Sequence, residues 1–508
     1  MALYFTFFKG LKIASEKQNQ RNMCQMKLLI SNFILLTSLF PCLAAEIKDV
    51  NDVRFRGDST LMNMRIENSY FADGAFLIET TGARFEYVKG QLKLYQGLDK
   101  GNRRLLSTIT FDNEPNFIKV EDNNDHILFW SKDLNIGIYG DSTLIISPKV
   151  NQNLKCKGNF RPDYEGRHRG EILLIDGKGG MEIYPQRHEA EYEIKKIELS
   201  KTDWTTDYRL NAGERVMIAV FPGRPFNWEE SFESNVAVTS GGTKKGNHPY
   251  GFGFMPPDDI IEYWSKFLDV IAVQWDGLWE NGRPHGPYKV ANPSELTRLI
   301  NTAHKNNMKV VLHCSLFYYS LKFSDFEDFY NQVKSVFDEY GNDGVYIDGM
   351  TFDDSRAITG RKIDNKILNW EMIRRLRQLF GKNGIIVYHA TNLGTPVATA
   401  PNIETYSNIT LSGEGVSFDS LDDLYVRYQI RKYGISNSIA VWIYDTKPSY
   451  LSKTKVIKAL VEMNGRECWN GYEFWRKNDE DNAFYDYYLQ ELKNSKKAYE
   501  NRQMSKKN

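Results

Sequence analysis

The chain has 508 residues, of which 41% are hydrophobic and 26% are charged. This composition is typical of globular proteins and excludes a wholly disordered chain, a collagen-like repeat and a protein with many membrane spans; the length favours two or three domains. Lys+Arg and Asp+Glu number 65 each, so no net positive charge is available to hold a nucleic acid.

The amino-terminal region has the features of a secretory signal peptide. Residues 1–45 hold five bases and one acid, and a short basic region precedes an apolar stretch from Leu28 to Phe40, followed by small residues. The stretch is shorter than the roughly 20 residues of a membrane span. We therefore expect a signal at 26–45 and a secreted or periplasmic protein with no integral membrane span after signal removal. The extension at 1–25 reflects an early start codon or, as the alternative, a leader that weakens export.

The cysteines are few once the signal is removed. Cys156, Cys314 and Cys468 remain, and no C-x-x-C pair occurs. An odd, sparse set of this kind argues against both a disulfide framework and a zinc knuckle.

Residues 46–240 show short runs of two-residue periodicity. Ala75–Glu79, Phe85–Val88 and Ile127–Trp130 are examples, and turns rich in Gly, Asn and Asp separate such runs. Several short strands with turn signals at this spacing predict an antiparallel β-sandwich domain.

Residues 246–508 switch to alternating apolar strands and amphipathic helices. Expected strands lie at 252–255, 270–273, 310–312, 344–347, 385–388, 403–409 and 439–443, with an irregular eighth near 469–472; expected helices include 258–267, 292–303, 324–337 and 365–380. Repeated βα units with wholly apolar strands require a parallel sheet covered by helices. The predicted fold class is therefore α/β: a C-terminal (β/α)8 TIM barrel that follows the β-sandwich domain in the chain. A doubly wound open sheet is the alternative, although no G-x-G-x-x-G follows the first strand.

Acidic and aromatic residues follow the carboxyl ends of these strands, where barrel enzymes build their active sites. Glycosidic cleavage needs one group to protonate the leaving oxygen and another to attack the anomeric carbon or activate water. Aromatic rings suit stacking on sugars. The candidate substrate contacts are Trp275, Asp276, Trp279, His313, Tyr318 and His389. The tryptophans could equally be core residues, Asp276 could cap a turn, and the histidines could be supporting groups.

The stretch Gly344–Gly349 is the most informative motif. An apolar strand that ends in Asp348-Gly349 delivers a carboxylate to the barrel mouth, and the glycine lets the chain turn beneath a substrate. The alternative is that Asp-Gly only caps the following loop.

The tract from Asp343 to Asp353 resembles the "DGVYFDG" strand-four motif of (β/α)8 glycoside hydrolases, including the α-galactosidase-like clan and related uncharacterised bacterial families. Residues 412–414, Ser-Gly-Glu, accompany it after the sixth strand. The resemblance implies a nucleophile at the end of strand four and an acid/base at the end of strand six, which places these roles on Asp348 and Glu414. Because the clan's acid/base is usually an aspartate, Asp445 is the rival.

These observations predict a secreted glycoside hydrolase that cleaves a poly- or oligosaccharide without a cofactor or metal. One alternative is a carbohydrate-binding protein on a barrel that has lost catalysis. Another is a metal-dependent deacetylase or amidohydrolase with His and Asp ligands at strand ends. No H-x-H, H-x-x-x-H or H-x-x-E-H spacing supports the metal enzyme.

Overall fold

The structure is a computed structural model that describes residues 52–168, 171–185, 198–200, 202–239, 255–320, 322–323, 325–350, 365–389, 401–412, 438–441, 465–470 and 479–507. These residues belong to one compact unit, Asp49–Asn508. None of the helices in these ranges is both long and apolar enough to cross a membrane. The signal predicted at 26–45 and the candidates Glu414 and Asp445 lie outside the described residues.

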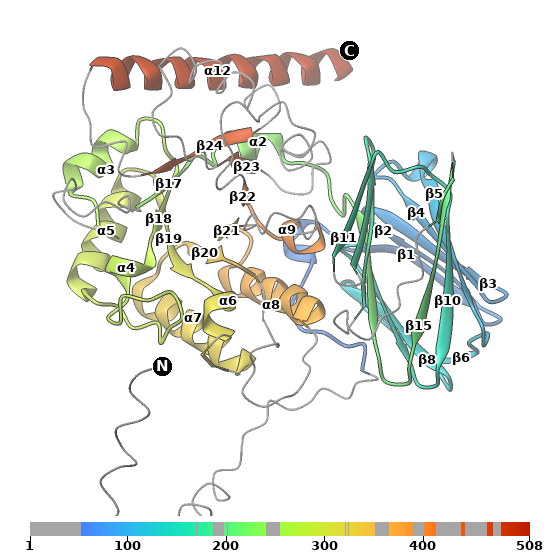
Figure 1. The fold of residues 1–508 in the computed structure, drawn as a ribbon. Coiled ribbons are helices and arrows are strands. Elements are labelled where there is room, and N and C mark those ends of the chain that lie inside the picture. Colours follow the sequence, from blue (N-terminus) through green and yellow to red (C-terminus); the bar gives the residue numbers. More distant parts are fainter. Residues whose placement is uncertain are drawn as a thin grey trace, which may run out of the picture. The chain divides into compact units, whose positions relative to one another are not determined.

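Two eight-stranded antiparallel sheets form the first part of the chain (Figure 1). Sheet A runs in the order β1 (Ile66–Ala72), β2 (Ala75–Thr80), β3 (Ala83–Val88), β4 (Gln91–Gln96), β5 (Arg104–Phe111), β10 (Gln152–Gly158), β15 (Trp204–Leu210) and β14 (Glu198–Leu199). Sheet B runs in the order β11 (Tyr164–His168), β12 (Glu171–Asp176), β13 (Gly179–Pro185), β16 (Val216–Phe221), β9 (Thr143–Pro148), β8 (Leu134–Tyr139), β7 (His126–Ser131) and β6 (Phe117–Asp122). Short helical turns η1 (Thr60–Met62), η2 (Lys100–Asn102) and α2 (Trp228–Ser231) complete this part.

The predicted β-sandwich is confirmed by the core that the two sheets share. Alternate residues of both sheets pack into one buried cluster, for example Phe76 and Ile78 of β2 with Phe129 of β7. The rings of Phe76 and Phe129 stack with their centroids 4.1 Å apart. Two-residue periodicity in the sequence therefore marks the inner face of each sheet, because successive side chains of a strand point to opposite sides.

Sheet C contains eight parallel strands that pair in chain order, and the last strand pairs again with the first. The strands are β17 (Val236–Val238), β18 (Val270–Val273), β19 (Lys309–Cys314), β20 (Gly344–Asp348), β21 (Ile385–His389), β22 (Ile409–Ser412), β23 (Ser438–Val441) and β24 (Gly465–Asn470). The helices of this part are α3 (Asp258–Trp264), α4 (Trp275–Leu278), α5 (Pro293–Lys305), α6 (Leu316–Ser320), α7 (Phe326–Tyr340), α8 (Asn365–Phe380), α9 (Pro401–Glu404) and α12 (Asp479–Lys507).

Two apolar layers explain why the strands of sheet C are hydrophobic throughout. One set of alternate residues forms an inner cluster: Val236, Val238, Val270, Ala272, Val311, Tyr346, Ile385, Val387, Ile409 and Leu411. The other set joins a cluster with α3, α5, α7 and α8, which run along the outside of the strands (Figure 1). Burial on both faces removes the two-residue pattern that a half-exposed strand would show.

The predicted helices 292–303 and 324–337 are observed as α5 and α7, which end two and three residues later than predicted, whereas the longest helix, α12, was not predicted. Asn292 caps α5 by accepting a hydrogen bond from the backbone nitrogen of Glu295 at 3.3 Å, and Pro293 occupies the first helical position. Asp325 caps α7, which ends at Gly341 in a left-handed conformation with φ of 65°.

The predicted fold class, with its complete (β/α)8 barrel, is wrong for the described chain. Strands dominate the structure, and within the described residues the crossover from β21 to β22 carries only the four-residue helix α9, while β22, β23 and β24 follow one another with no described helix between them. Four residues cannot present the apolar stripe of a covering helix, which needs two turns or more. The predicted strand 403–409 overlaps α9, and the first parallel strand is Val236–Val238, inside the range predicted for the sandwich. Three residues are too few to show a period.

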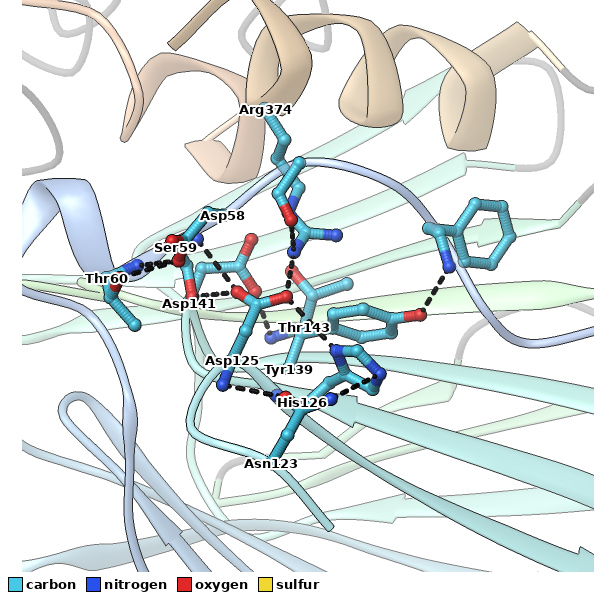
Figure 2. Close-up of polar contacts among 12 residues, drawn as sticks. Asp58, Ser59, Thr60, Asn123, Asp125, His126, Tyr139, Asp141, Thr143 and Arg374 are labelled. Carbon is cyan, nitrogen blue, oxygen red and sulfur yellow. Dashed lines mark hydrogen bonds and ion pairs between the residues drawn. The ribbon is translucent and has the colours of Figure 1, made fainter. Parts of the chain in front are cut away.

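A buried polar cluster joins the sandwich sequence to α8 (Figure 2). Arg374 of α8 forms an ion pair with Asp125, which precedes β7, and donates a hydrogen bond to the carbonyl of Gly57 at 3.1 Å. A Cβ added to Gly57 would lie 2.4 Å from the Cβ of Arg374, and the φ of Gly57 is +96°. Glycine at this position therefore allows the segment before β1 to lie directly against the helix.

Candidate functional site

Polar residues occupy the last inward positions of three adjacent parallel strands. His313 follows Val311 on β19, Asp348 follows Tyr346 on β20, and His389 follows Val387 on β21, always two residues further along. Backbone pairing places Asp348 opposite His389. Because alternate residues of a strand share a face, the side chains that follow the inner apolar layer meet at the carboxyl end of the sheet.

Asp348 lies between the two histidines. Its Oδ2 is 3.4 Å from Nε2 of His313, and its Oδ1 is 3.1 Å from Nδ1 of His389. Both imidazoles are almost fully buried, whereas the Asp348 side chain retains 18% exposure. The carboxylate is therefore held from two sides and remains partly exposed at the carboxyl end of sheet C.

The pKa of Asp348 lies well below its ordinary range. Burial alone would raise this pKa, but hydrogen bonds from His313 and His389 and the electrostatic attraction of these two side chains outweigh burial. Asp348 is therefore ionised at every pH at which an enzyme normally works. It can act as a nucleophile or a base, and it cannot be the group that donates the proton.

Gly349 allows α6, which follows β19, to lie close to the end of β20. Its φ is +66°, and a Cβ at this position would lie 2.9 Å from the Cβ of Phe317. The carbonyl of Gly349 accepts a hydrogen bond from the backbone nitrogen of Phe317 at 2.9 Å. The glycine of the Asp-Gly motif is thus required by both conformation and space.

Asp276 is a second carboxyl at the carboxyl end of sheet C, in the first turn of α4, which follows β18. Its oxygens are buried, and no side chain of the described residues donates a hydrogen bond to them. Burial raises the pKa of Asp276 to about 6, although hydrogen bonds from the amides of Asp276 and Gly277 act in the opposite direction. Asp276 therefore exchanges a proton near pH 6, where Asp348 does not.

The three predicted aromatic contacts differ in their exposure. Trp279 is 1% exposed, and its Nε1 donates a hydrogen bond to the carbonyl of His313 at 2.9 Å. Its indole is therefore a buried group that holds the backbone of β19 in place. Trp275 is partly buried against the core, and Tyr318 is 40% exposed. Tyr318 is thus the aromatic side chain of the predicted set with the largest face open to a ligand.

Two tyrosines near Asp348 are not among the predicted site residues. The hydroxyl of Tyr346 lies 2.8 Å from Nδ1 of His389. Tyr288 is buried, and the backbone nitrogen of Ser315 donates to its hydroxyl oxygen at 3.1 Å. Alternation along β20 would have found Tyr346, which shares the inward face with Asp348; no local signal marks Tyr288, which lies in a loop before α5.

The described residues contain no cluster of three or more His, Cys, Asp or Glu side chains that could hold a metal ion. His313, Asp348 and His389 instead form a hydrogen-bonding row in which the carboxylate lies between two rings.

Asp276 gives a prediction about stability that does not depend on any substrate. Because the pKa of its carboxyl rises from an ordinary 3.8 to about 6 in the folded chain, the folded state binds more protons than the unfolded state between these values. Wild-type stability should therefore fall as pH rises through this window, and Asp276→Asn should remove that part of the fall. Thermal unfolding would be measured at steps from pH 4 to pH 7.5. The stability of Asp276→Asn relative to the wild type should increase up to about pH 6, and the difference between the two proteins should be constant above that pH. A difference that does not change with pH would contradict the assignment.

No family model matches the chain. No curated protein matches it either. Among solved structures, it is similar to a GH31 dextranase from Flavobacterium johnsoniae, at 10% identity, with 86% of this chain and 68% of that chain covered and a TM-score of 0.39. It is also similar to a GH31 alpha-xylosidase from a soil metagenome, at 7% identity, with coverage of 85% and 86% and a TM-score of 0.38. A cycloalternan-forming enzyme from Listeria monocytogenes shows 7% identity, coverage of 84% and 54%, and a TM-score of 0.38. Because these TM-scores are below 0.5, the function proposed below depends on the side chains of the site.

Proposed function

We propose that the chain is a glycoside hydrolase whose base-side or nucleophilic carboxylate is Asp348. The observation that carries this proposal is the position of Asp348 at the end of β20, partly exposed and held ionised between His313 and His389. A carboxylate of this kind can attack an anomeric carbon directly or take a proton from water. The histidines fix its two oxygens, which lowers the entropy lost on reaching an attacking geometry.

The side chains around Asp348 suit a neutral, hydroxyl-rich substrate. The stretches that directly follow β18, β19 and β20, residues 274–279, 315–320 and 349–350, contain no Lys or Arg. A phosphorylated substrate would need such cations to offset its charge, whereas sugar hydroxyls need carboxyl, amide and imidazole partners. Tyr318 offers an exposed ring for the apolar face of a pyranose.

The remaining roles follow from the chemistry of the reaction. Glu414, with Asp445 as the alternative, supplies the proton to the leaving oxygen, as the family resemblance implies. Asp276 makes a hydroxyl contact, and below about pH 6 its protonated carboxyl donates a hydrogen bond as well as accepting one. His313 and His389 orient Asp348, while Trp275 and Trp279 line and support the site.

A substrate screen tests this function. The full chain would be incubated with a panel of oligosaccharides, polysaccharides and aryl glycosides, with and without EDTA, and new reducing ends would be separated by chromatography. Release that EDTA does not affect, and that Asp348→Asn abolishes, is the expected result.

The other outcomes of the screen separate the alternatives. Glycan binding by calorimetry without any release would identify a carbohydrate-binding protein. Loss of hydrolysis on addition of EDTA would identify a metal-dependent hydrolase. Neither release nor binding across the panel would reject a carbohydrate substrate altogether.

A further inference from the structure

Three buried rings lie side by side on the inward face of sheet C, near its carboxyl end. They belong to His313 of β19, Tyr346 of β20 and His389 of β21, and the Tyr346 centroid is 5.1 Å from that of His313 and 5.9 Å from that of His389. Each is at most 2% exposed. Their position fixes how Asp348, two residues beyond Tyr346, meets the imidazoles.

Nδ1 of His389 has two oxygen neighbours. The hydroxyl of Tyr346 is 2.8 Å away, and Oδ1 of Asp348 is 3.1 Å away. An ionised carboxylate only accepts hydrogen bonds. A bare Nδ1 lone pair facing that oxygen would place two acceptors in contact at a buried site, where repulsion is strong. Nδ1 must therefore carry the proton, which it donates toward Asp348, with the hydroxyl oxygen of Tyr346 as its second acceptor.

We propose that Tyr346 is a positioning residue that, together with Asp348, fixes His389 in the Nδ1–H tautomer, with the acceptor lone pair on Nε2. Both oxygens come from β20, because residues two apart on a strand share a face. Without the hydroxyl, Nδ1 loses the nearer of these two oxygens, and the ring is held less firmly in the orientation in which its proton faces Asp348. The effect on turnover rests on the function proposed above, in which His389 holds the Asp348 carboxylate in its attacking orientation; the tautomer itself does not.

Nitrogen NMR of the full chain tests the tautomer directly. Two-bond proton–nitrogen spectra of 15N-histidine-labelled protein distinguish Nδ1–H from Nε2–H rings, and loss of one signal in His389→Gln assigns the residue. The wild type should show the Nδ1–H pattern for His389. Tyr346→Phe should move this signal toward the mixed-tautomer average. The matched control is Tyr87→Phe, which removes a buried hydroxyl that donates to the carbonyl of Pro115 at 3.0 Å in the sandwich, and it should leave the His389 signal unchanged.

Two results would overturn the assignment: an Nε2–H pattern for His389 in the wild type, which needs no variant to fold, or a His389 signal that Tyr346→Phe does not move. On the best substrate of the screen, Tyr346→Phe should lower kcat about tenfold and change KM less than about twofold, while Tyr87→Phe changes neither. An unchanged kcat would reject the catalytic consequence. The expected spectra in a chain that cleaves no glycoside would support the positioning role of Tyr346 and reject the proposed function.

Discussion

Asp348→Asn is expected to lower kcat by about 10³-fold or more, with a much smaller change in KM. The substitution keeps the size of the side chain and removes the negative charge that the two histidines hold in place. An amide cannot form a glycosyl ester and is too weak a base to activate water, so the transition state loses its partner while ground-state sugar contacts remain. Steady-state kinetics on the best substrate of the screen would measure the loss.

A matched control lies at the other end of the same strand. Asp343 precedes β20, where its Oδ2 accepts a hydrogen bond from the backbone nitrogen of Val310 at 2.7 Å. Asp343→Asn keeps an acceptor there and should retain wild-type kcat. Equal losses in the two variants would show that β20 matters only for folding, and full activity in Asp348→Asn would remove Asp348 from the mechanism.

A third variant and the stereochemistry of the product address the two roles left open for Asp348. Asp348→Gly leaves space for an external anion such as azide. Azide in this space should restore turnover and yield a glycosyl azide in either role, which shows that Asp348 acts on the attacking face. The anomeric configuration of the first wild-type product, followed by proton NMR, decides between the roles: retention identifies a nucleophile, and inversion identifies a base that activates water.

Local patterns predicted the elements that local physics determines. The strand Gly344–Asp348 and the helix Asn365–Phe380 agree with the structure because each is specified by its own residues: a short apolar run, and a 3.6-residue apolar stripe that ends before Gly381. The strand Val236–Val238 was missed because three residues carry no period, and its place beside β18 and β24 is fixed only by pairing with distant strands.

The candidate site was also predictable only where its residues follow a local pattern. Asp348, His313 and His389 could be placed together because each follows an apolar strand, and parallel strands end at a common edge. Trp279 could not be separated from a sugar platform in advance, because its burial depends on a hydrogen bond to the backbone of β19. Contacts between residues far apart in the chain, such as Asp125 with Arg374, leave no trace in a local pattern.

That contact leads to the largest stability effect that we expect. The Arg374 side chain is 0% exposed, and its guanidinium lies 4.7 Å from the ring centre of Tyr139 and 4.5 Å from that of Trp370. Beside it, Asp141 is buried and accepts hydrogen bonds from Trp370 at 2.7 Å and from Tyr406 at 2.6 Å. Arg374→Met would leave Asp125 and Asp141 without their buried cation, which should lower the free energy of unfolding by about 3–5 kcal/mol.

Urea unfolding at several pH values would test this loss and its cause. Burial would raise the pKa of Asp125, but the charge of Arg374 and hydrogen bonds from His126 and Ser59 outweigh burial and hold this pKa well below its ordinary value. In the wild type this carboxylate therefore adds stability above its unfolded pKa, and the contribution disappears as pH falls through the folded value. In Arg374→Met the pKa of Asp125 is no longer held down, so as pH falls below about 4 the wild type loses stability that the variant does not have to lose, and the gap between the two proteins should narrow.

Two further variants decide whether the ion pair or general packing is responsible. Asp125→Asn combined with Arg374→Met should be less destabilised than the sum of the single changes, because the second change removes the charge that the first leaves unpaired. Lys334→Met breaks only an exposed ion pair with Asp338 on α7 and should leave the urea midpoint unchanged. Strict additivity, or a loss in Arg374→Met that is constant from acid to neutral pH, would contradict this explanation. Either result would mean that apolar contacts hold α8 in place and that the ion pair between Arg374 and Asp125 does not contribute to stability.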